Sequence, residues 1–329
     1  MNLAFPLIAL AVGVSAAPYN HDPNVAQELR PRDGLPNVFA KIAAGETVRV
    51  AYLGGFPVQS VEGVVRHAWQ AKPQTDLCFV YTIGTWMLKE LQAGKQPGFG
   101  AVMETVANHY GIPSIDLGVE IAKQEADGRL VYQGTAPVEG KLVFSADGVH
   151  PGDGGHEIYR DVIARSILAM QGTVGPKPHV LPERMNARCW EAATLLPVQQ
   201  AELSAGWVPV DADKDPVYTD DRGRTSQMLR GAVKCDEVGE TITVRWNGTT
   251  LGFSDIPHGD PMTVEVVIDG ATTHSFERVQ QEARHQSARF FYLPELEPGK
   301  HTVTLTIKKL PEGVSFYAGQ LLVAGTPLP

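Results

Sequence analysis

The hydrophobic pattern of this chain changes character once, near residue 172, and that change limits the folds that the chain can adopt. Before it, short apolar runs typical of buried strands alternate with stretches of helical spacing. After residue 185, apolar and polar residues alternate with a period of two, interrupted by Asn-Gly, Asp-Gly and Pro-Gly pairs. The first pattern predicts βαβ crossovers and a parallel sheet, and the second predicts a β-sandwich or jelly roll.

The pattern also sets the expected elements and boundaries. Strands are expected at 48–53, 76–83, 112–117 and 142–145, and helices at 62–70, 86–92, 101–110, 119–126 and 156–170. Prolines and glycines between the two patterns predict a linker. The expected division is a leader at 1–17, a polar N-terminal arm at 18–45, an α/β domain at 46–172, a linker at 173–185 and a β-sandwich domain at 186–329.

The first 17 residues contain no charged side chain. An apolar run, Leu3–Val14, precedes the small residues Ser15, Ala16 and Ala17, which is typical of a secretory signal peptide and its cleavage site. The alternative is a short buried helix, and the run is too short for a secure membrane span. We therefore expect a secreted or periplasmic protein.

The charge balance narrows the classes of partner. Lys and Arg number 28 against 37 Asp and Glu, giving a net charge of −9, and the basic residues form no run. This balance argues against a protein that follows nucleic-acid phosphates. We expect a small-molecule or carbohydrate ester as the partner, no nucleic acid, no membrane span and no cofactor, and the oligomeric state stays open.

The chain has three cysteines. Only one intramolecular disulfide can form among three thiols. Cys189 and Cys235 both lie in the second half of the chain, so they are the expected pair. Cys78 lies within the apolar run LCFVYTI and is expected to be a buried thiol. A separate motif, Asn247-Gly248-Thr249, is formally a glycosylation site, but its Asn-Gly pair favours a hairpin turn.

The segment with the clearest chemistry lies just before the helix expected at 156–170. Asp147 and His150 are three residues apart, so the carboxylate can meet imidazole Nδ1 and leave Nε2 facing outward as a general base. One alternative is a simple Asp-Gly turn with a solvent-facing histidine. The other is a metal site formed by His150, Asp153 and His156.

Longer strings carry a family resemblance. FSADGVHPGDGGHEIY resembles the last catalytic block of the SGNH/GDSL hydrolases. VRVAYLGG resembles the strand before the nucleophile loop in a subgroup of that superfamily, and EGVVRHAWQAKPQTDLCFVYTI and VANHYGIPSIDLG resemble its middle. The resemblance covers about residues 35–172.

The resemblance implies both a fold and an activity. The implied fold class is α/β, with a truncated flavodoxin-like parallel sheet, followed by the all-β domain. The implied chemistry is cofactor-independent, serine-dependent hydrolysis of esters, often of acyl groups on carbohydrates. By resemblance, Asp147 and His150 take the Asp and His roles of a catalytic triad.

The sequence departs from the family where the nucleophile belongs. Gly54-Gly55 is followed by Phe56-Pro57 instead of a serine, and the interval before the helix at 62–70 is too short for a further strand and helix. The pattern is that of a chain that has lost an internal segment at about residues 56–60.

No other hydroxyl is assigned as the nucleophile. Ser60 is expected to be a helix N-cap, Ser114 lies in a buried strand, and Ser145 is close to His150 in sequence. Thr82 and Thr85 follow a strand at the edge where such sheets bind ligands, and are interpreted as ordinary loop hydroxyls.

Three interpretations of function follow. The chain is a secreted esterase-like protein acting on acylated carbohydrate, a non-catalytic carbohydrate-binding protein, or the incomplete product of an esterase gene. In the second half, six aromatic residues offer either a sugar-stacking platform or ordinary core packing: Trp190, Trp207, Trp246, Phe290, Phe291 and Tyr292.

Overall fold

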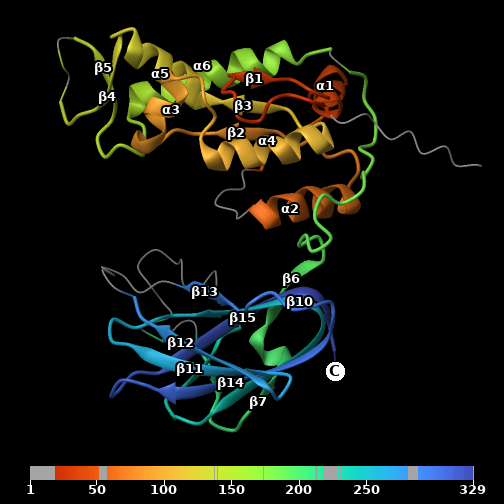
Figure 1. Cartoon of the computed structure of the whole chain (residues 1–329), viewed down its shortest axis with the longest axis vertical. Coiled ribbons are helices and arrows are strands. Elements are labelled where there is room, and N and C mark those ends of the chain that lie inside the picture. Colours follow the sequence, from red (N-terminus) through yellow and green to blue (C-terminus); the bar gives the residue numbers. More distant parts are fainter. Residues whose placement is uncertain are drawn as a thin grey trace, which may run out of the picture. The chain divides into compact units, whose positions relative to one another are not determined.

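The structure divides into two compact units, Met1–Cys189 and Trp190–Pro329, called here the N-terminal and C-terminal units (Figure 1). It is a computed structural model that describes residues 19–51, 58–136, 138, 140–172, 174–211, 214, 215, 217, 229, 231–280 and 288–328. The expected leader at 1–17 and the Gly54–Pro57 turn lie outside the described residues.

The N-terminal unit contains two small sheets. The first has the order β1-β3-β2, formed by Leu29–Arg30 (β1), Phe79–Tyr81 (β2) and Ser114–Asp116 (β3), with β2 and β3 parallel and β1 antiparallel to β3. The second is the parallel pair β4 (Leu130–Gln133) and β5 (Leu142–Ser145). The expected strands at 76–83 and 112–117 are thus present in shorter form as β2 and β3, and the one at 142–145 as β5, whereas β1 and β4 were not predicted.

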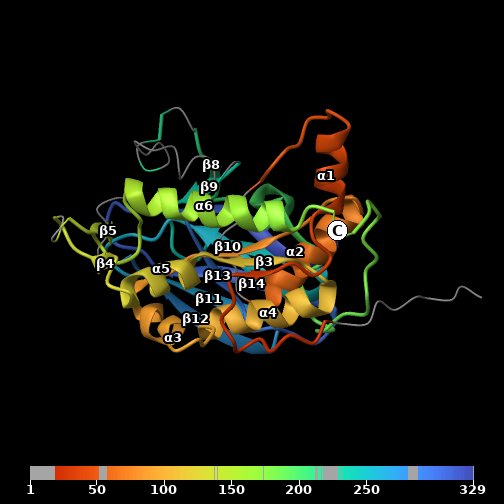
Figure 2. The ribbon, with the colours of Figure 1, turned by 90° about the horizontal axis from the view of Figure 1, so that it is seen from above.

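Six α-helices are described in this unit: α1 (Pro36–Ala43), α2 (Val58–Ala71), α3 (Leu88–Gln92), α4 (Gly98–Tyr110), α5 (Leu117–Ala126) and α6 (Asp153–Ala169). A 3₁₀ turn, Thr85–Met87, precedes α3. In Figure 1, α5 and α6 lie on one side of the first sheet and α4 on the other, with α2 packed on α4. Figures 1 and 2 place α1 at one end of the unit and β4 and β5 at the other. None of the described helices is long and apolar enough to cross a membrane.

Local sequence explains where these helices begin and end. Glycine at position 111 takes φ +69°, which stops α4 in a left-handed C-cap. The Asp116 side chain accepts the Gly118 N–H at 2.9 Å and caps α5. Ser60, expected as an N-cap, instead lies inside the first turn of α2, so that prediction is wrong because the helix begins two residues earlier.

One expected strand is absent from its described part. Residues 48–51 have no regular secondary structure, and Val50 is 71% exposed. Instead, Leu29–Arg30 from the expected polar arm pairs with β3. An apolar run forms a strand only where it can pair with the edge of another strand and become buried. Here one edge of β3 is already paired with Leu29–Arg30 from the arm.

The segment that follows α6 is held against the rest of the N-terminal unit. The Glu62 carboxylate accepts the backbone N–H groups of Met185 at 2.6 Å and Asn186 at 2.9 Å. The His179 ring stacks on Trp69 with centroids 4.5 Å apart, and its Nε2 lies 2.8 Å from the buried Asp76 carboxylate. Residues 177–186 are therefore called the strap.

The C-terminal unit is a β-sandwich, as the period-two pattern predicted. Its described strands are β6 (Ala193–Pro197), β7 (Glu202–Leu203), β8 (Val208–Pro209), β9 (Val233–Cys235), β10 (Thr241–Asp255), β11 (Met262–Ile268), β12 (Thr272–Arg278), β13 (Arg289–Tyr292), β14 (Gly299–Lys309) and β15 (Phe316–Pro327). The order is β12-β11-β14-β10-β15-β9-β8, with β13 and β7 on β10 and β6 on β15, and every pairing is antiparallel.

Of the three Xaa-Gly pairs expected to form turns, Asp269-Gly270 and Asn247-Gly248 behave differently. Asp269 and Gly270 both have positive φ, 52° and 71°, and join β11 to β12 as predicted. Asn247-Gly248 is not a turn, because β10 continues through it to Asp255. At Gly248 the strand comes so close to β15 that an added β-carbon would meet the Ala324 carbonyl oxygen.

None of the three cysteines forms a disulfide, so the expected Cys189–Cys235 bond is not present in this structure. Cys235 is 1% exposed in β9, where it packs in the core of the C-terminal unit, whereas Cys189 is the last residue of the N-terminal unit. Cys78 is half-buried against a core cluster of the N-terminal unit, and burial raises the pKa of its thiol to about 12. A thiol with that pKa is protonated and inert at neutral pH.

Candidate active site

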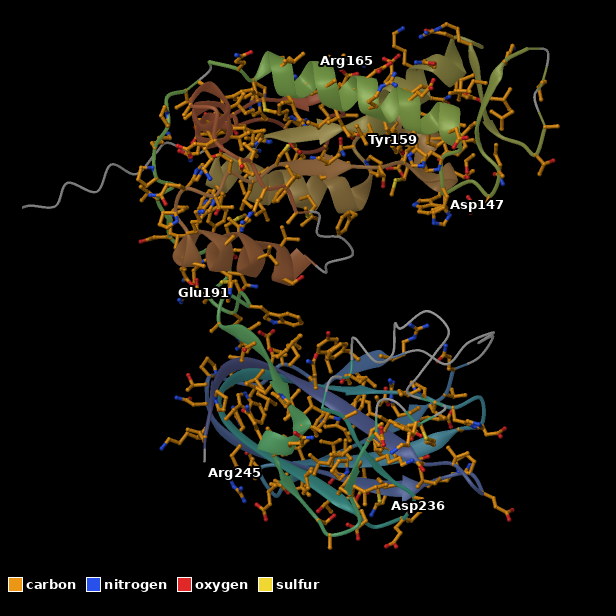
Figure 3. The ribbon with its side chains drawn as sticks, turned by 180° about the vertical axis from the view of Figure 1, so that it is seen from behind. Asp147, Tyr159, Arg165, Glu191, Asp236 and Arg245 are labelled. Carbon is orange, nitrogen blue, oxygen red and sulfur yellow. The ribbon has the colours of Figure 1, made fainter. Side chains whose placement is uncertain are left out.

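The loop between β5 and α6 carries the candidate residues, and it is closed by its own backbone. Gly152 N–H donates to the Phe144 carbonyl at 2.8 Å, and Ser145 forms an isolated bridge with Pro151. The loop lies at the same end of the N-terminal unit as β4 and β5, where Asp147 projects outward (Figure 3). The strand β5 and the helix α6 therefore hold the seven residues between them in one closed loop.

The Asp147 and His150 side chains meet. Asp147 Oδ2 lies 2.7 Å from His150 Nδ1, while Oδ1 accepts the backbone N–H of Val149 at 2.9 Å and of His150 at 2.8 Å. The hydrogen bond from the His150 ring, followed by these N–H donors, lowers the pKa of Asp147 well below its usual range. The carboxylate is thus ionised and fixes the ring so that Nδ1 donates and Nε2 accepts.

The His150 ring is accessible. Its side chain is 84% exposed, so Nε2 faces water and any ligand that enters the loop region. Among the described residues, Asp147 is the polar partner of the ring, and no serine or threonine hydroxyl hydrogen-bonds to it. Asp147 thus orients His150 as a base. Within the described part of the chain, no side chain is placed as a nucleophile beside it.

Gly148 connects this loop to the 3₁₀ turn Thr85–Met87, which follows β2. Its carbonyl accepts the backbone N–H and the hydroxyl of Thr85, both at 2.9 Å. With φ +83°, Gly148 adopts a left-handed conformation, and a β-carbon there would collide with Thr85 Oγ1 and approach Gln133 Oε1 at 2.9 Å. Thr85, interpreted from sequence as an ordinary loop hydroxyl, therefore positions the loop through these hydrogen bonds, although both Thr82 and Thr85 are exposed.

The serines weighed as nucleophiles are held in other roles. Ser145, 1% exposed, accepts the Gly148 N–H at 2.9 Å and donates to Asp147 Oδ1 at 3.1 Å, so its hydroxyl supports the carboxylate. Ser114 is 2% exposed and bonds to Arg32. Ser60 is buried in α2. The expected nucleophile position after Gly54-Gly55 lies outside the described residues.

The metal-site alternative receives no support. Within the described ranges, His150, Asp153 and His156 do not converge, and no group of three His, Cys, Asp or Glu side chains is arranged to hold an ion. Asp153 begins α6, and the His156 side chain projects to solvent one turn later.

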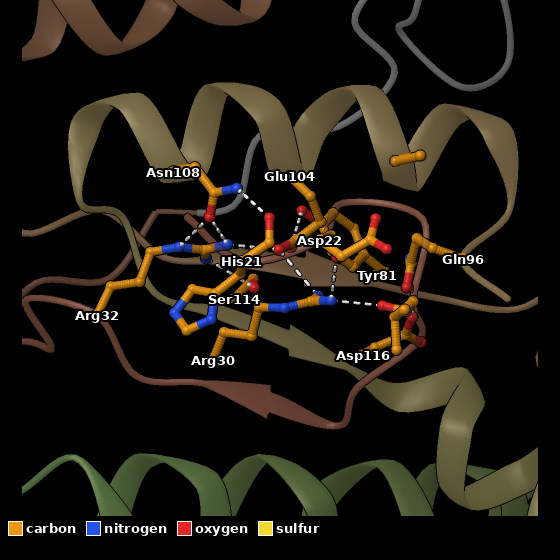
Figure 4. Close-up of polar contacts among 12 residues, drawn as sticks. His21, Asp22, Arg30, Arg32, Tyr81, Gln96, Glu104, Asn108, Ser114 and Asp116 are labelled. Atoms are coloured by element: carbon orange, nitrogen blue, oxygen red, sulfur yellow. Dashed lines mark hydrogen bonds and ion pairs between the residues drawn. The ribbon is translucent and has the colours of Figure 1, made fainter. Parts of the chain in front are cut away.

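A buried charge cluster was missed by the sequence analysis (Figure 4). Glu104 on α4, fully buried, accepts from Arg30 Nη1 at 2.9 Å, from Arg32 Nη2 at 2.5 Å and from the Tyr81 hydroxyl at 2.8 Å. Burial opposes ionisation of Glu104, but the Ser114 hydroxyl and the Arg32 guanidinium outweigh it and lower its pKa. One feature of the sequence could have revealed this cluster. Glu104 lies at helical spacing from Gly100 and Ala107, so a charged residue falls on the buried face of α4.

Asp116 is a second buried carboxyl group beside this cluster. It accepts from Gln96 Nε2 at 2.9 Å, while the Gln96 Oε1 atom is buried without a hydrogen-bond partner. Burial raises the pKa of Asp116 from 3.8 to about 6. The native state therefore holds a proton that the unfolded chain releases, and the free energy of unfolding should fall as pH rises from about 4 to about 6.

Asp116→Asn is expected to remove this pH dependence and to raise the free energy of unfolding at pH 7 by about 2–3 kcal/mol. The asparagine keeps the N-cap and gains a donor for Gln96 Oε1. Urea denaturation at pH 4 and pH 7 measures the effect, with the exposed Asp161→Asn as the matched control. Equal gains at both pH values would contradict the buried-acid explanation.

The aromatic residues of the C-terminal unit separate into two groups. Trp207, Trp246 and Phe291 are buried in the core, at 8%, 0% and 6% exposure. Tyr292 is 41% exposed, and Trp190 and Phe290 are half-buried beside it. Core packing explains the first group. The residues of the second group lie at the surface of the C-terminal unit.

Comparison with known proteins gives a fold. No model of a known protein family matches the chain, and no curated protein matches it. A solved two-domain esterase active on acetylated mannans, co-crystallised with mannopentaose, has a TM-score of 0.60 and 17% identity, covering 82% of this chain and 67% of that one. Another structure of a two-domain esterase active on acetylated mannans has a TM-score of 0.60 and 16% identity, covering 89% of this chain and 76% of that one. The chain thus has a two-domain, esterase-like fold.

Proposed function

We propose that this protein hydrolyses esters of acylated carbohydrates, with His150 as the general base. Asp147 orients the His150 ring and stabilises the positive charge that the ring gains when it takes up a proton. The observation that carries the proposal is the 2.7 Å contact between Asp147 Oδ2 and an exposed His150 ring. The fold adds support, because the solved two-domain esterases with that fold act on acetylated mannans. Membership of the SGNH/GDSL hydrolases and secretion are part of the same proposal.

The proposed reaction uses water as the attacking group. His150 Nε2 removes a proton from a water molecule as its oxygen bonds to the acyl carbon, which gives a tetrahedral intermediate and an imidazolium ion. Asp147 stabilises that positive charge. The bond from the acyl carbon to the sugar oxygen then breaks, and the imidazolium returns the proton to that oxygen. The products are a carboxylic acid and the free sugar hydroxyl.

Acetate release tests the proposal. The full chain is expected to liberate acetate from acetylated mannan and from an aryl acetate, and a His150→Ala protein prepared in parallel controls for contaminating esterases. A fluorophosphonate probe is expected to leave the protein unlabelled, because water supplies the attacking oxygen. Labelling that requires His150 would replace water by a serine nucleophile but keep the esterase assignment.

One observation favours a second function, non-catalytic carbohydrate binding. Among the described residues, no hydroxyl is placed against His150 Nε2 to serve as a nucleophile. If no acetate is released from either substrate while the protein binds polysaccharide, this second function replaces the first.

A further inference from the structure

The surface around Tyr292 is built from one row of residues across four strands. The strand registers place Tyr292 opposite Gly252, Gly252 opposite Leu322, and Leu322 opposite Leu195. Directly paired residues share a face of a sheet. Because Phe291 points into the core, this row lies on the outer face of the C-terminal unit.

Gly252 lets the Tyr292 ring lie down on the sheet. A β-carbon at Gly252 would be 2.6 Å from Tyr292 Cδ1 and 2.8 Å from Cε1, closer than such atoms can pack. The ring therefore covers the space that a side chain would fill. One face of the ring lies over the backbone of β10, and Tyr292 as a whole is 41% exposed.

Two further rings extend this surface. Phe290 is nearly parallel to Tyr292, with an interplanar angle of 14° and centroids 6.1 Å apart. Trp190 is tilted by 39°, with its centroid 5.7 Å from that of Tyr292. We call Trp190, Phe290 and Tyr292 the aromatic platform. It has two near-parallel rings and a third ring set at an angle beside them.

We propose that the aromatic platform binds a chain of pyranose sugars by stacking, as a site separate from the Asp147–His150 pair. The C–H face of a pyranose is flat, apolar and weakly positive, so it fits a flat aromatic face with its negative quadrupole. A contiguous exposed apolar patch is the kind of surface at which ligands bind. The choice of carbohydrate as occupant rests on the proposed function, whereas the platform itself rests on the geometry above.

The polar surroundings agree with a sugar ligand. Gln320 on β15 lies on the same outer face, beside Ser254, whose hydroxyl accepts the Gln320 N–H at 2.5 Å. Gln320 is half-buried, and its side-chain amide is a group that can both donate to and accept from sugar hydroxyls. Since stacking uses the ring face and not the acyl group, acetylated and deacetylated chains should bind alike.

Binding measurements on the full chain test the proposal. Calorimetric titration uses acetylated mannan, deacetylated mannan and xylan as probes. Tyr292→Ala and Phe290→Ala are each expected to weaken binding about tenfold or more, as loss of a central aromatic contact does. Tyr292→Trp should preserve binding, and Val238→Ala, which shortens a 59% exposed apolar side chain on another turn, should leave it unchanged. Phe290→Ala does not uncover Gly252, so it reports on binding if Tyr292→Ala unfolds.

His150→Ala separates this proposal from the proposed function, because it should bind all three probes as the wild type does. Wild-type binding to none of the polysaccharides would overturn the platform proposal, as would unchanged binding by both alanine variants. Acetate release with no effect of the platform variants on binding would leave the esterase proposal standing alone. A dimer that Tyr292→Ala converts to monomers would identify the platform as a contact between two copies instead.

Discussion

Replacing Glu104 with glutamine is expected to lower the free energy of unfolding of the N-terminal unit by about 3–5 kcal/mol. The substitution keeps the size of the side chain but removes its charge. Arg30 and Arg32, 2% and 5% exposed, then lose the carboxylate that both of them contact. Since a domain is typically stable by about 5–15 kcal/mol, this loss is large enough to populate the unfolded N-terminal unit.

Hydrogen exchange of peptides from α4 and β3 during chemical denaturation measures this effect for the N-terminal unit alone. The control is Asp127→Asn, which removes exposed ion pairs with Lys123 and Arg129 and should leave the denaturation midpoint unchanged. A loss below about 1 kcal/mol in Glu104→Gln would show that the two guanidinium groups find other compensation, against the expectation from their burial.

The second large effect concerns the rate of ester hydrolysis. Asp147→Asn is expected to slow it by about 10³–10⁴-fold, because the amide no longer fixes the imidazole with its proton on Nδ1. The new side chain can still accept the Val149 and His150 N–H groups through its oxygen, so the loop should keep its shape. Acetate release at saturating substrate gives the comparison.

Ser145→Ala is the matched control for that variant. It removes one hydrogen bond to Asp147 and the acceptor for the Gly148 N–H, but it leaves the carboxylate and the ring in place. We expect a rate reduced about tenfold or less. If both variants lost activity equally, Ser145 would be acting in the reaction itself. Equal activity of Asp147→Asn and the wild type would remove Asp147 from the mechanism.

The local parts of the structure could be predicted from sequence. Helical spacing located α2 and α4–α6 to within a few residues, and the Asp269-Gly270 turn followed from its residue types. The contact between Asp147 and His150 is also local, since three residues and a turn bring the side chains together. Each of these features depends on residues that are neighbours in the chain.

The parts that could not be predicted depend on distant partners. Arg30 and Glu104 are 74 positions apart, and nothing in the arm indicates that its arginines enter a core. Thr85 reaches Gly148 across 63 positions. The run at 48–53 has strand-like composition, but the neighbours of a strand are set by the whole fold, and residues 48–51 do not form one.

The strap has a practical consequence for work on the N-terminal unit by itself. A fragment that ends at residue 172, where the sequence pattern changes, would lack Met185 and Asn186. The Glu62 carboxylate, which is 3% exposed, would then lose two of its N–H donors. It would also lack His179, so the stacking on Trp69 and the hydrogen bond with Asp76 would be lost. Such a fragment must run through Asn186, so the folding boundary lies at residue 186 rather than at residue 172, where the hydrophobic pattern changes.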